Sequence, residues 1–183
     1  MDGVTEIDIG IRELIDGVDG SADSWDVILT DEEFKEAVRI SELRISEARR
    51  LKCKEKYDYD RDHKTDGDDG AVAELAVCKY LNIEWSKSVN TFKSVPDVIC
   101  DNLGIEVRGT RIPNGRLIFR DDDFDDRFYL LVIVSGRKCR IVGGLPGAKC
   151  RHKRFRTNFN NNRCESYGVD QSFLSKIRDR RPK

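Results

Sequence analysis

Residues 71–81 (AVAELAVCKYL) constrain the fold most, because almost every one of them is apolar or small. A helix over this stretch is apolar around nearly all of its circumference, which is typical of a buried helix. We therefore expect this helix to pack against a sheet. Glu74 and Lys79 are the exceptions, and a charged side chain in such surroundings is costly unless it is paired or helps to bind a metal.

Short runs typical of strands follow this helix in quick succession, and turn residues separate them. The runs are residues 98–100, 105–107, 116–119, 128–134 and 140–142. Their spacing predicts a meandering, largely antiparallel sheet. Ahead of the apolar helix, Thr30 and Glu33 fit a capping box and predict a long helix over residues 31–53. Residues 54–69 lack apolar periodicity, so we expect a loop there.

Charge is distributed unevenly along the 183 residues, although the formal net charge is only -1. Residues 1–29 hold many acids and only Arg12 as a base, which predicts an acidic, partly disordered segment with a short helix near residues 11–15. Residues 30–183 have the size of a single domain. Within this domain, residues 149–163 are strongly basic.

The sequence shows no sign of a membrane or secreted protein. No apolar stretch approaches the ~20 residues of a membrane helix, and the N-terminus lacks the features of a signal peptide. We expect a cytoplasmic protein, in the host cytoplasm if the source is viral, with no membrane partner. The six cysteines are spread singly, without a CxxC pair, and are expected to be reduced thiols, mostly in the core.

Two acids stand on neighbouring strand-like runs joined by a tight turn. Asp97 precedes the first run and Glu106 lies in the second, so hairpin pairing brings their carboxylates close together. Two carboxylates that share a site repel one another unless a proton or cation lies between them. Mg²⁺ is the natural occupant because it prefers oxygen ligands, and Glu74 supplies a third carboxylate. Without metal, at least one carboxylate pKa should be raised.

The order of a helical glutamate (GAVAELAV), then Pro96-Asp97, then Glu106-Val107-Arg108 resembles the PD-(D/E)XK nuclease superfamily, including its resolvase-like and phage-encoded members. The resemblance covers roughly residues 67–142. It implies the restriction-endonuclease-like α/β fold, in which helices flank a mixed central sheet. It also implies that Asp97, Glu106 and the carbonyl of Val107 hold Mg²⁺, or alternatively Mn²⁺, for phosphodiester hydrolysis.

The same resemblance gives Glu74 and Arg108 their expected roles. Glu74 would hold a second ion or orient the waters of the first. Arg108 stands where the family usually has lysine, and a guanidinium stays protonated and cannot act as a general base. It can still stabilise the charge that develops on the phosphate. Lys87 or Lys93 is the alternative source of an ammonium group.

The basic segment is the expected substrate-binding surface, with DNA as the substrate. Phe155 and Phe159 are available for stacking, and six cations can neutralise phosphates. These cations are Lys149, Arg151, Lys153, Arg154, Arg156 and Arg163. A homodimer is one expected assembly, since many small nucleases of this fold pair subunits to cut two strands. No nucleotide cofactor is expected.

Simpler structural explanations stand beside these assignments. Asp97 and Glu106 could be solvent-facing acids, Glu74 a salt-bridged helix residue, and Arg108 a partner in a structural ion pair. Three acids begin a pattern like a calcium loop but lack its glycine: Asp58, Asp60 and Asp62. Three zinc ligands lack an evident fourth: Cys150, His152 and Cys164. The acids within residues 121–126 are expected to form a solvated loop or the start of a helix.

Two other functions also remain open. The chain could be a catalytically inactive version of the fold that binds nucleic acid or a protein partner. It could instead be a small interaction factor whose acidic N-terminus mimics nucleic acid. The first alternative predicts binding without metal-dependent cleavage, and the second predicts loss of function when residues 1–30 are deleted.

Overall fold

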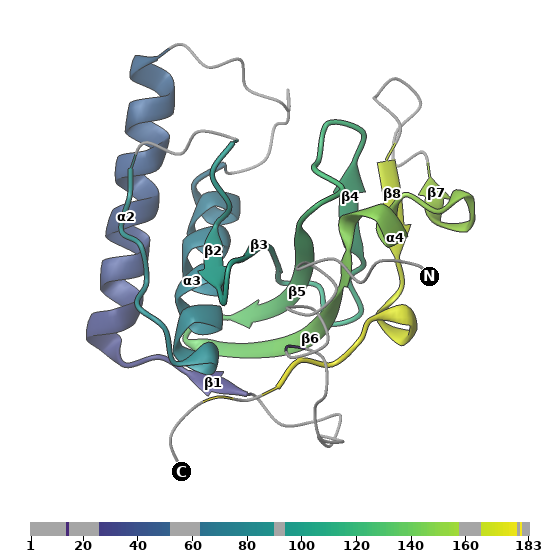
Figure 1. Cartoon of the computed structure of the whole chain (residues 1–183). Helices are drawn as coiled ribbons and strands as arrows, with labels where there is room; N and C mark the ends of the chain where they lie inside the picture. Colours follow the sequence, from purple (N-terminus) through teal and green to yellow (C-terminus); the bar gives the residue numbers. More distant parts are fainter. Residues whose placement is uncertain are drawn as a thin grey trace.

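The computed structural model describes residues 14, 26–51, 63–89, 94–157, 166–178 and 180. They form an α/β structure with two sheets, and Figure 1 shows helices α2 and α3 side by side along one flank. The helices are α2 (Asp31–Arg50), α3 (His63–Leu81) and α4 (Gly147–Cys150), with 3-10 turns η1 (Lys153–Phe155) and η2 (Gln171–Phe173). No helix among the described residues is long and apolar enough to span a membrane.

The larger sheet has five strands in the order β1-β6-β5-β3-β2. In chain order they are β1 (Val27–Ile28), β2 (Val98–Cys100), β3 (Leu103–Thr110), β5 (Phe128–Ser135) and β6 (Lys138–Pro146). Strands β3 and β5 are parallel, and the other neighbours are antiparallel. Strand β1 belongs to this sheet although it precedes residue 30, the predicted start of the domain, so the folded part begins a few residues earlier than predicted.

The smaller sheet has three strands in the order β4-β8-β7. They are β4 (Leu117–Arg120), β7 (Arg156–Thr157) and β8 (Ser166–Val169). The prediction of one meandering sheet is therefore wrong, since β4 belongs to a second sheet and β5 runs parallel to β3. The expected mixed, largely antiparallel character of the central sheet is confirmed. The segment between β3 and β5 contains β4, and this excursion carries the chain back to the end of the sheet where β3 began.

Strand β5 shows why the large sheet needs cover on both faces. Its residues from Phe128 to Val134 are all buried, and successive side chains of a strand point to opposite faces. Leu130 and Val132 pack in the cluster that contains α3, whereas Leu131 and Ile133 pack with residues of the smaller sheet. The molecule thus has three layers, with helices, the mixed sheet and the smaller sheet in that order (Figure 1).

The two long helices begin and end for different reasons. Helix α2 confirms the predicted helix, because Thr30 and Glu33 form the capping box, and it ends at Arg50. Helix α3 begins at His63, so the predicted loop is wrong for residues 63–69. The first buried turn of α3 is held by the sheet, because Gly109 of β3 lies so close that an added Cβ would be 2.7 Å from the carbonyl oxygen of Asp69. A tertiary contact therefore outweighs the polar local sequence.

Four buried cysteines confirm the prediction of reduced core thiols among the described residues: Cys78, Cys100, Cys139 and Cys150. Burial raises the pKa of Cys78, Cys139 and Cys150 to about 12, so these thiols stay neutral. Of the predicted helix near residues 11–15, only the helical, buried Leu14 is described.

Candidate active site

Asp97 and Glu106 are brought together by the hairpin of β2 and β3. Val98 pairs with Ile105, so Asp97 and Glu106 flank this pair on the two strands. The backbone N–H of Val107 donates to Asp97 Oδ2 at 2.8 Å. An N–H and a C=O of one strand residue point to the same edge, so the Val107 carbonyl also faces the side of Asp97. The sequence prediction of this juxtaposition is confirmed.

The three predicted carboxylates approach from different sides of the sheet. In β3, Ile105 and Val107 pack toward α3, so Glu106 between them points to the opposite face. Glu74 comes from α3, on the other side of the sheet. Asp97 stands at the start of the short edge strand β2, and its electrostatic coupling reaches both glutamates. The charge of Glu106 in turn acts on Glu74, so each of the three acids is influenced by another of them.

The pKa values of all three carboxyl groups are raised, as predicted. Burial, followed by the charge of Glu74, raises the pKa of Asp97 to about 6. Burial, followed by the charge of Asp97, raises the pKa of Glu106. Burial also raises the pKa of Glu74, against the opposing effect of Arg44. A cation placed among these groups would relieve their repulsion.

Arg44 of α2 holds Glu74 and was not predicted from the sequence. Its Nη1 donates to the two Glu74 carboxylate oxygens at 2.8 and 2.7 Å, and its Nε donates to the carbonyl of Ser88 at 3.0 Å. Trp85 Nε1 lies 3.5 Å from Glu74 Oε2. A signal for Arg44 was available, because it continues the buried stripe of Ala37 and Ile40 at helical spacing.

Arg127, immediately before β5, holds Glu106 and was also missed. Its Nη1 donates to Glu106 Oε1, and its Nη2 donates to the carbonyl of Ser94 at 2.7 Å. Its guanidinium carbon lies 4.1 Å from the centre of the Phe124 ring. The side chain is therefore fixed against the acidic site by three different kinds of contact. Its place before a buried strand gives no local sign of this role.

Arg108 lies between two carboxylates on the face opposite α3. Its Nη1 is 3.4 Å from Glu106 and its Nη2 donates to Asp123 at 3.1 Å. Burial lowers its pKa, whereas the charges of Asp123 and Glu106 raise it, and the net direction is upward. The buried Nε has no hydrogen-bond partner in the described structure. Arg108 is thus a fixed, permanently charged group with one unused donor beside the acids.

The loop of residues 121–126 is not uniformly solvated as predicted. Asp123 is buried and accepts a hydrogen bond from the backbone N–H of Arg120 at 2.9 Å, in addition to the one from Arg108. Arg151 donates to the Asp123 carbonyl at 3.1 Å and pairs with Asp125 at 2.9 Å. One acid of the run is therefore structural, because it positions Arg108, while the others remain exposed.

The predicted metal ligands form a pair with a carbonyl, not a three-carboxylate cluster. Across the described ranges, no three carboxylate, imidazole or thiol groups gather closely enough to hold one ion. Asp97, Glu106 and the carbonyl of Val107 remain as the oxygen donors that the β2–β3 hairpin brings together. Mg²⁺ commonly binds one or two carboxylates and keeps several waters, so this donor set fits it. Glu74, held by Arg44, lies outside this set.

The other residues that the sequence suggested for a site either lie elsewhere in the fold or fall outside the described residues. Lys87 is exposed and pairs with Glu36 of α2 at 3.2 Å, so it is not part of the site. Lys93, Cys164 and the acids of the proposed calcium loop lie outside the described residues. The alternatives that depend on them therefore stay untested.

The basic segment is divided by the fold. Arg151 turns inward, because it holds the 121–125 loop and its guanidinium carbon lies 4.9 Å from the Phe119 ring centre. Four of the predicted cations are exposed: Lys149, Lys153, Arg154 and Arg156. Arg163 and Phe159 lie outside the described residues. Arg151 is thus a structural residue, and the exposed members remain candidates for phosphate binding.

Comparisons with known proteins add no relative to this description. The chain matches no family model, no characterised protein and no solved structure. The structure is therefore described by its own features. It is an α/β chain with a mixed five-stranded sheet, long helices on one face of that sheet and a carboxylate pair at the β2–β3 hairpin.

Proposed function

We propose that this protein is a metal-dependent nuclease that hydrolyses phosphodiester bonds of DNA at the site of Asp97 and Glu106. The observation that carries the proposal is the coupled carboxylate pair beside the Val107 carbonyl at the start of β2. Burial raises the pKa of both acids, helped by the charge of Glu74 at Asp97 and by the charge of Asp97 at Glu106, and a divalent cation would relieve this repulsion. The restriction-endonuclease-like assignment is part of this proposal.

Asp97, Glu106 and the Val107 carbonyl would hold Mg²⁺ or Mn²⁺. When bound, the ion polarises the phosphate and lowers the pKa of a coordinated water. Asp97 Oδ2 accepts from Val107, which keeps this carboxylate in a fixed orientation. Fixed ligands favour catalysis because little reorganisation is needed as charge develops.

Arg108 supports the same chemistry through charge. Asp123 holds its guanidinium near Glu106, so its positive charge is fixed beside the acids. This group cannot remove a proton from water, because it stays protonated throughout the physiological range. Its role is to stabilise the phosphate as negative charge accumulates in the transition state. Glu74 acts through its charge on Asp97, which strengthens the attraction for a cation.

A specific observation favours a second candidate, a non-catalytic nucleic-acid binder. Glu106 accepts from Arg127, and Glu74 accepts from Arg44. These ion pairs neutralise two of the acids without a metal. In this case the exposed basic residues bind DNA and the acids serve only to stabilise the fold.

A cleavage assay separates the two candidates. Plasmid, linear duplex, branched and single-stranded DNA are incubated with Mg²⁺, Mn²⁺ or EDTA, using wild type, Asp97→Asn and Glu106→Gln. Each substitution is expected to reduce metal-dependent cleavage by about 100-fold or more, because it removes a charged ligand of nearly the same shape. Glu84→Gln is the matched control, since Glu84 is an exposed acid after α3. DNA binding without cleavage, unaffected by either site variant, would support the non-catalytic binder.

A further inference from the structure

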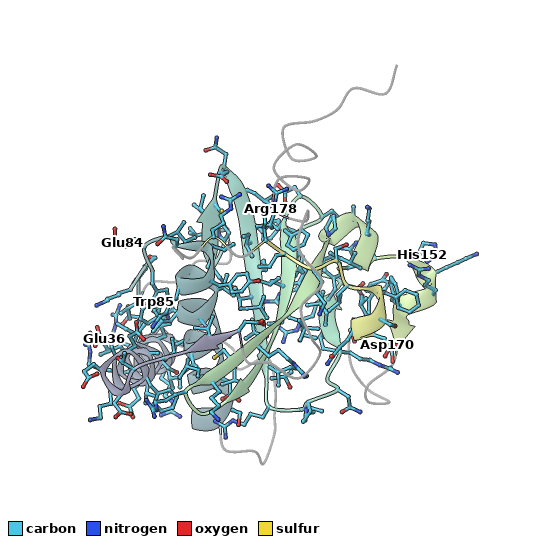
Figure 2. All side chains as sticks on the ribbon, turned by 90° about the horizontal axis from the view of Figure 1, so that it is seen from below. Glu36, Glu84, Trp85, His152, Asp170 and Arg178 are labelled. Atoms are coloured by element: carbon cyan, nitrogen blue, oxygen red, sulfur yellow. The ribbon has the colours of Figure 1, made fainter. Side chains whose placement is uncertain are left out.

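A small pocket lies on the smaller sheet, away from the carboxylate pair. Its volume is about 250 Å³, and its lining includes Arg116, Arg154, Arg156, Asp170 and Phe173. These residues come from β4, β7, β8 and the two 3-10 turns or their borders. Figure 2 shows Asp170 and His152 at the end of the molecule opposite Trp85 and Glu36. The pocket is thus separate from the contacts that α2 and α3 make with the acids.

The lining of the pocket is rich in guanidinium groups. Three of its side chains are guanidinium groups and one is a carboxylate. Asp170 pairs with Arg116 at 2.7 Å. Arg154 and Arg156 add two further cations on η1 and β7. Arginine matches the geometry of phosphate oxygens, which makes a phosphate group the fitting anion.

Aromatic rings hold one of these arginines in place. The guanidinium carbon of Arg154 lies 4.5 Å from the ring centre of Phe155 and 4.6 Å from that of Phe173. The two rings are 5.3 Å apart and inclined by 65°. Phe155 is buried, whereas Phe173 is 46% exposed. The pocket therefore combines a positioned guanidinium with an accessible aromatic surface, the two features that recognise a phosphate and a flat base.

The pocket is also connected to the proposed catalytic site through a short structural path. Arg151, just before η1, holds the carbonyl of Asp123 at 3.1 Å. Asp123 in turn holds Arg108 beside Glu106. A ligand bound at the pocket is thus attached to the same packed unit that positions the acids. This arrangement suits a substrate-anchoring site better than an independent surface patch.

We propose that the pocket binds one nucleotide of a single-stranded nucleic acid, with the phosphate on Arg154 and the base on Phe173. This inference deepens the proposed nuclease function and rests on it for the choice of a strand as ligand. The exposed ring of Phe173 can stack on an unpaired base, whereas a duplex keeps its bases stacked inside and offers no free base face.

Fluorescence anisotropy tests the proposal in EDTA, with an Asp97→Asn background so that cleavage does not interfere. The probe is a labelled thymidine strand of about 10 nucleotides, within the range of site sizes for single-strand binders. Arg154→Gln and Phe173→Ala are each expected to weaken its binding about 10-fold. Arg154→Gln should also lower the slope of log affinity against log salt by about one. Arg39→Gln, an exposed arginine of α2, is the charge-matched control and should have little effect.

Three further arms define the ligand. The affinity for a duplex of the same length should not change in Phe173→Ala. The strand should bind Phe173→Leu as weakly as Phe173→Ala, because leucine has no aromatic face. Thymidine monophosphate should compete better than inorganic phosphate, but less well than the unlabelled strand. Far-UV circular dichroism verifies that each variant is folded.

Several results would overturn the inference. These are wild-type affinity in both pocket variants, an equal loss in Arg39→Gln, or a free mononucleotide that competes better than the strand. Failure of the nuclease proposal is seen separately, as strand binding that depends on the pocket without any metal-dependent cleavage. Cleavage that persists with unchanged strand affinity in Arg154→Gln and Phe173→Ala refutes only the pocket.

Discussion

Replacing Arg44 with methionine should destabilise the fold in a strongly pH-dependent way. The Arg44 and Glu74 side chains are only 18% and 9% exposed, and their bonds of 2.7 and 2.8 Å use both carboxylate oxygens. Removing one partner of a buried ion pair typically costs about 3–5 kcal/mol. Because Arg44 lies at the rim of the buried region, we expect the lower end, about 3 kcal/mol at pH 8.

The pH dependence follows from the pKa of Glu74, which burial raises above its ordinary value. Arg44 opposes this shift, so its removal raises the pKa further. A group with a raised folded-state pKa contributes stability that is present below its unfolded value and lost as pH rises through its folded value. Protonated Glu74 needs no cation, so the loss in Arg44→Met should shrink to about 1 kcal/mol near pH 5.

Urea unfolding at pH 5 and pH 8 measures both quantities, with tryptophan fluorescence and far-UV circular dichroism compared as a test of two-state behaviour. With a slope of about 2 kcal/mol per molar urea, a loss of about 3 kcal/mol moves the midpoint by about 1.5 M. Glu74→Gln combined with Arg44→Met should abolish the pH dependence of the difference. Arg39→Met, on the exposed face of the same helix, is the control. Equal midpoint shifts at the two pH values would refute the reasoning.

Three further outcomes are expected. Mn²⁺ affinity, measured by electron paramagnetic resonance, should fall about tenfold per pH unit below pH 6. Binding needs ionised Asp97, whose pKa is raised to about 6. Constant affinity from pH 5 to pH 8 would contradict this prediction. Gly144→Ala should lower the thermal midpoint, because its Cβ would lie 2.3 Å from the Tyr129 carbonyl oxygen, whereas Gly70→Ala on α3 has nothing within 4 Å and should raise it. Thr30→Ala should cost about 1 kcal/mol in urea unfolding through loss of the α2 cap, and an unchanged midpoint would show that the cap is dispensable.

Local patterns were sufficient to predict the features that depend on neighbours in the chain. The capping box marked the start of α2, and turn residues between apolar runs marked the β2–β3 hairpin. This hairpin is what places Asp97 beside Glu106. Because its two strands are joined by so short a turn, their register depends on the local sequence, and the carboxylate pair could be predicted from it.

The tertiary structure alone decided which distant segments meet. The parallel pairing of β3 with β5 follows from the excursion through the smaller sheet, which no spacing in the sequence encodes. Arg44 and Arg127 reach Glu74 and Glu106 across 30 and 21 residues of chain, and neither stands in a recognisable motif. The apolar pattern of the sequence determined which faces of the elements must be covered. Because hydrophobic burial is non-directional, the pattern did not determine what covers them. Which layer covers each face, and which arginine meets each acid, depends on packing of the whole chain.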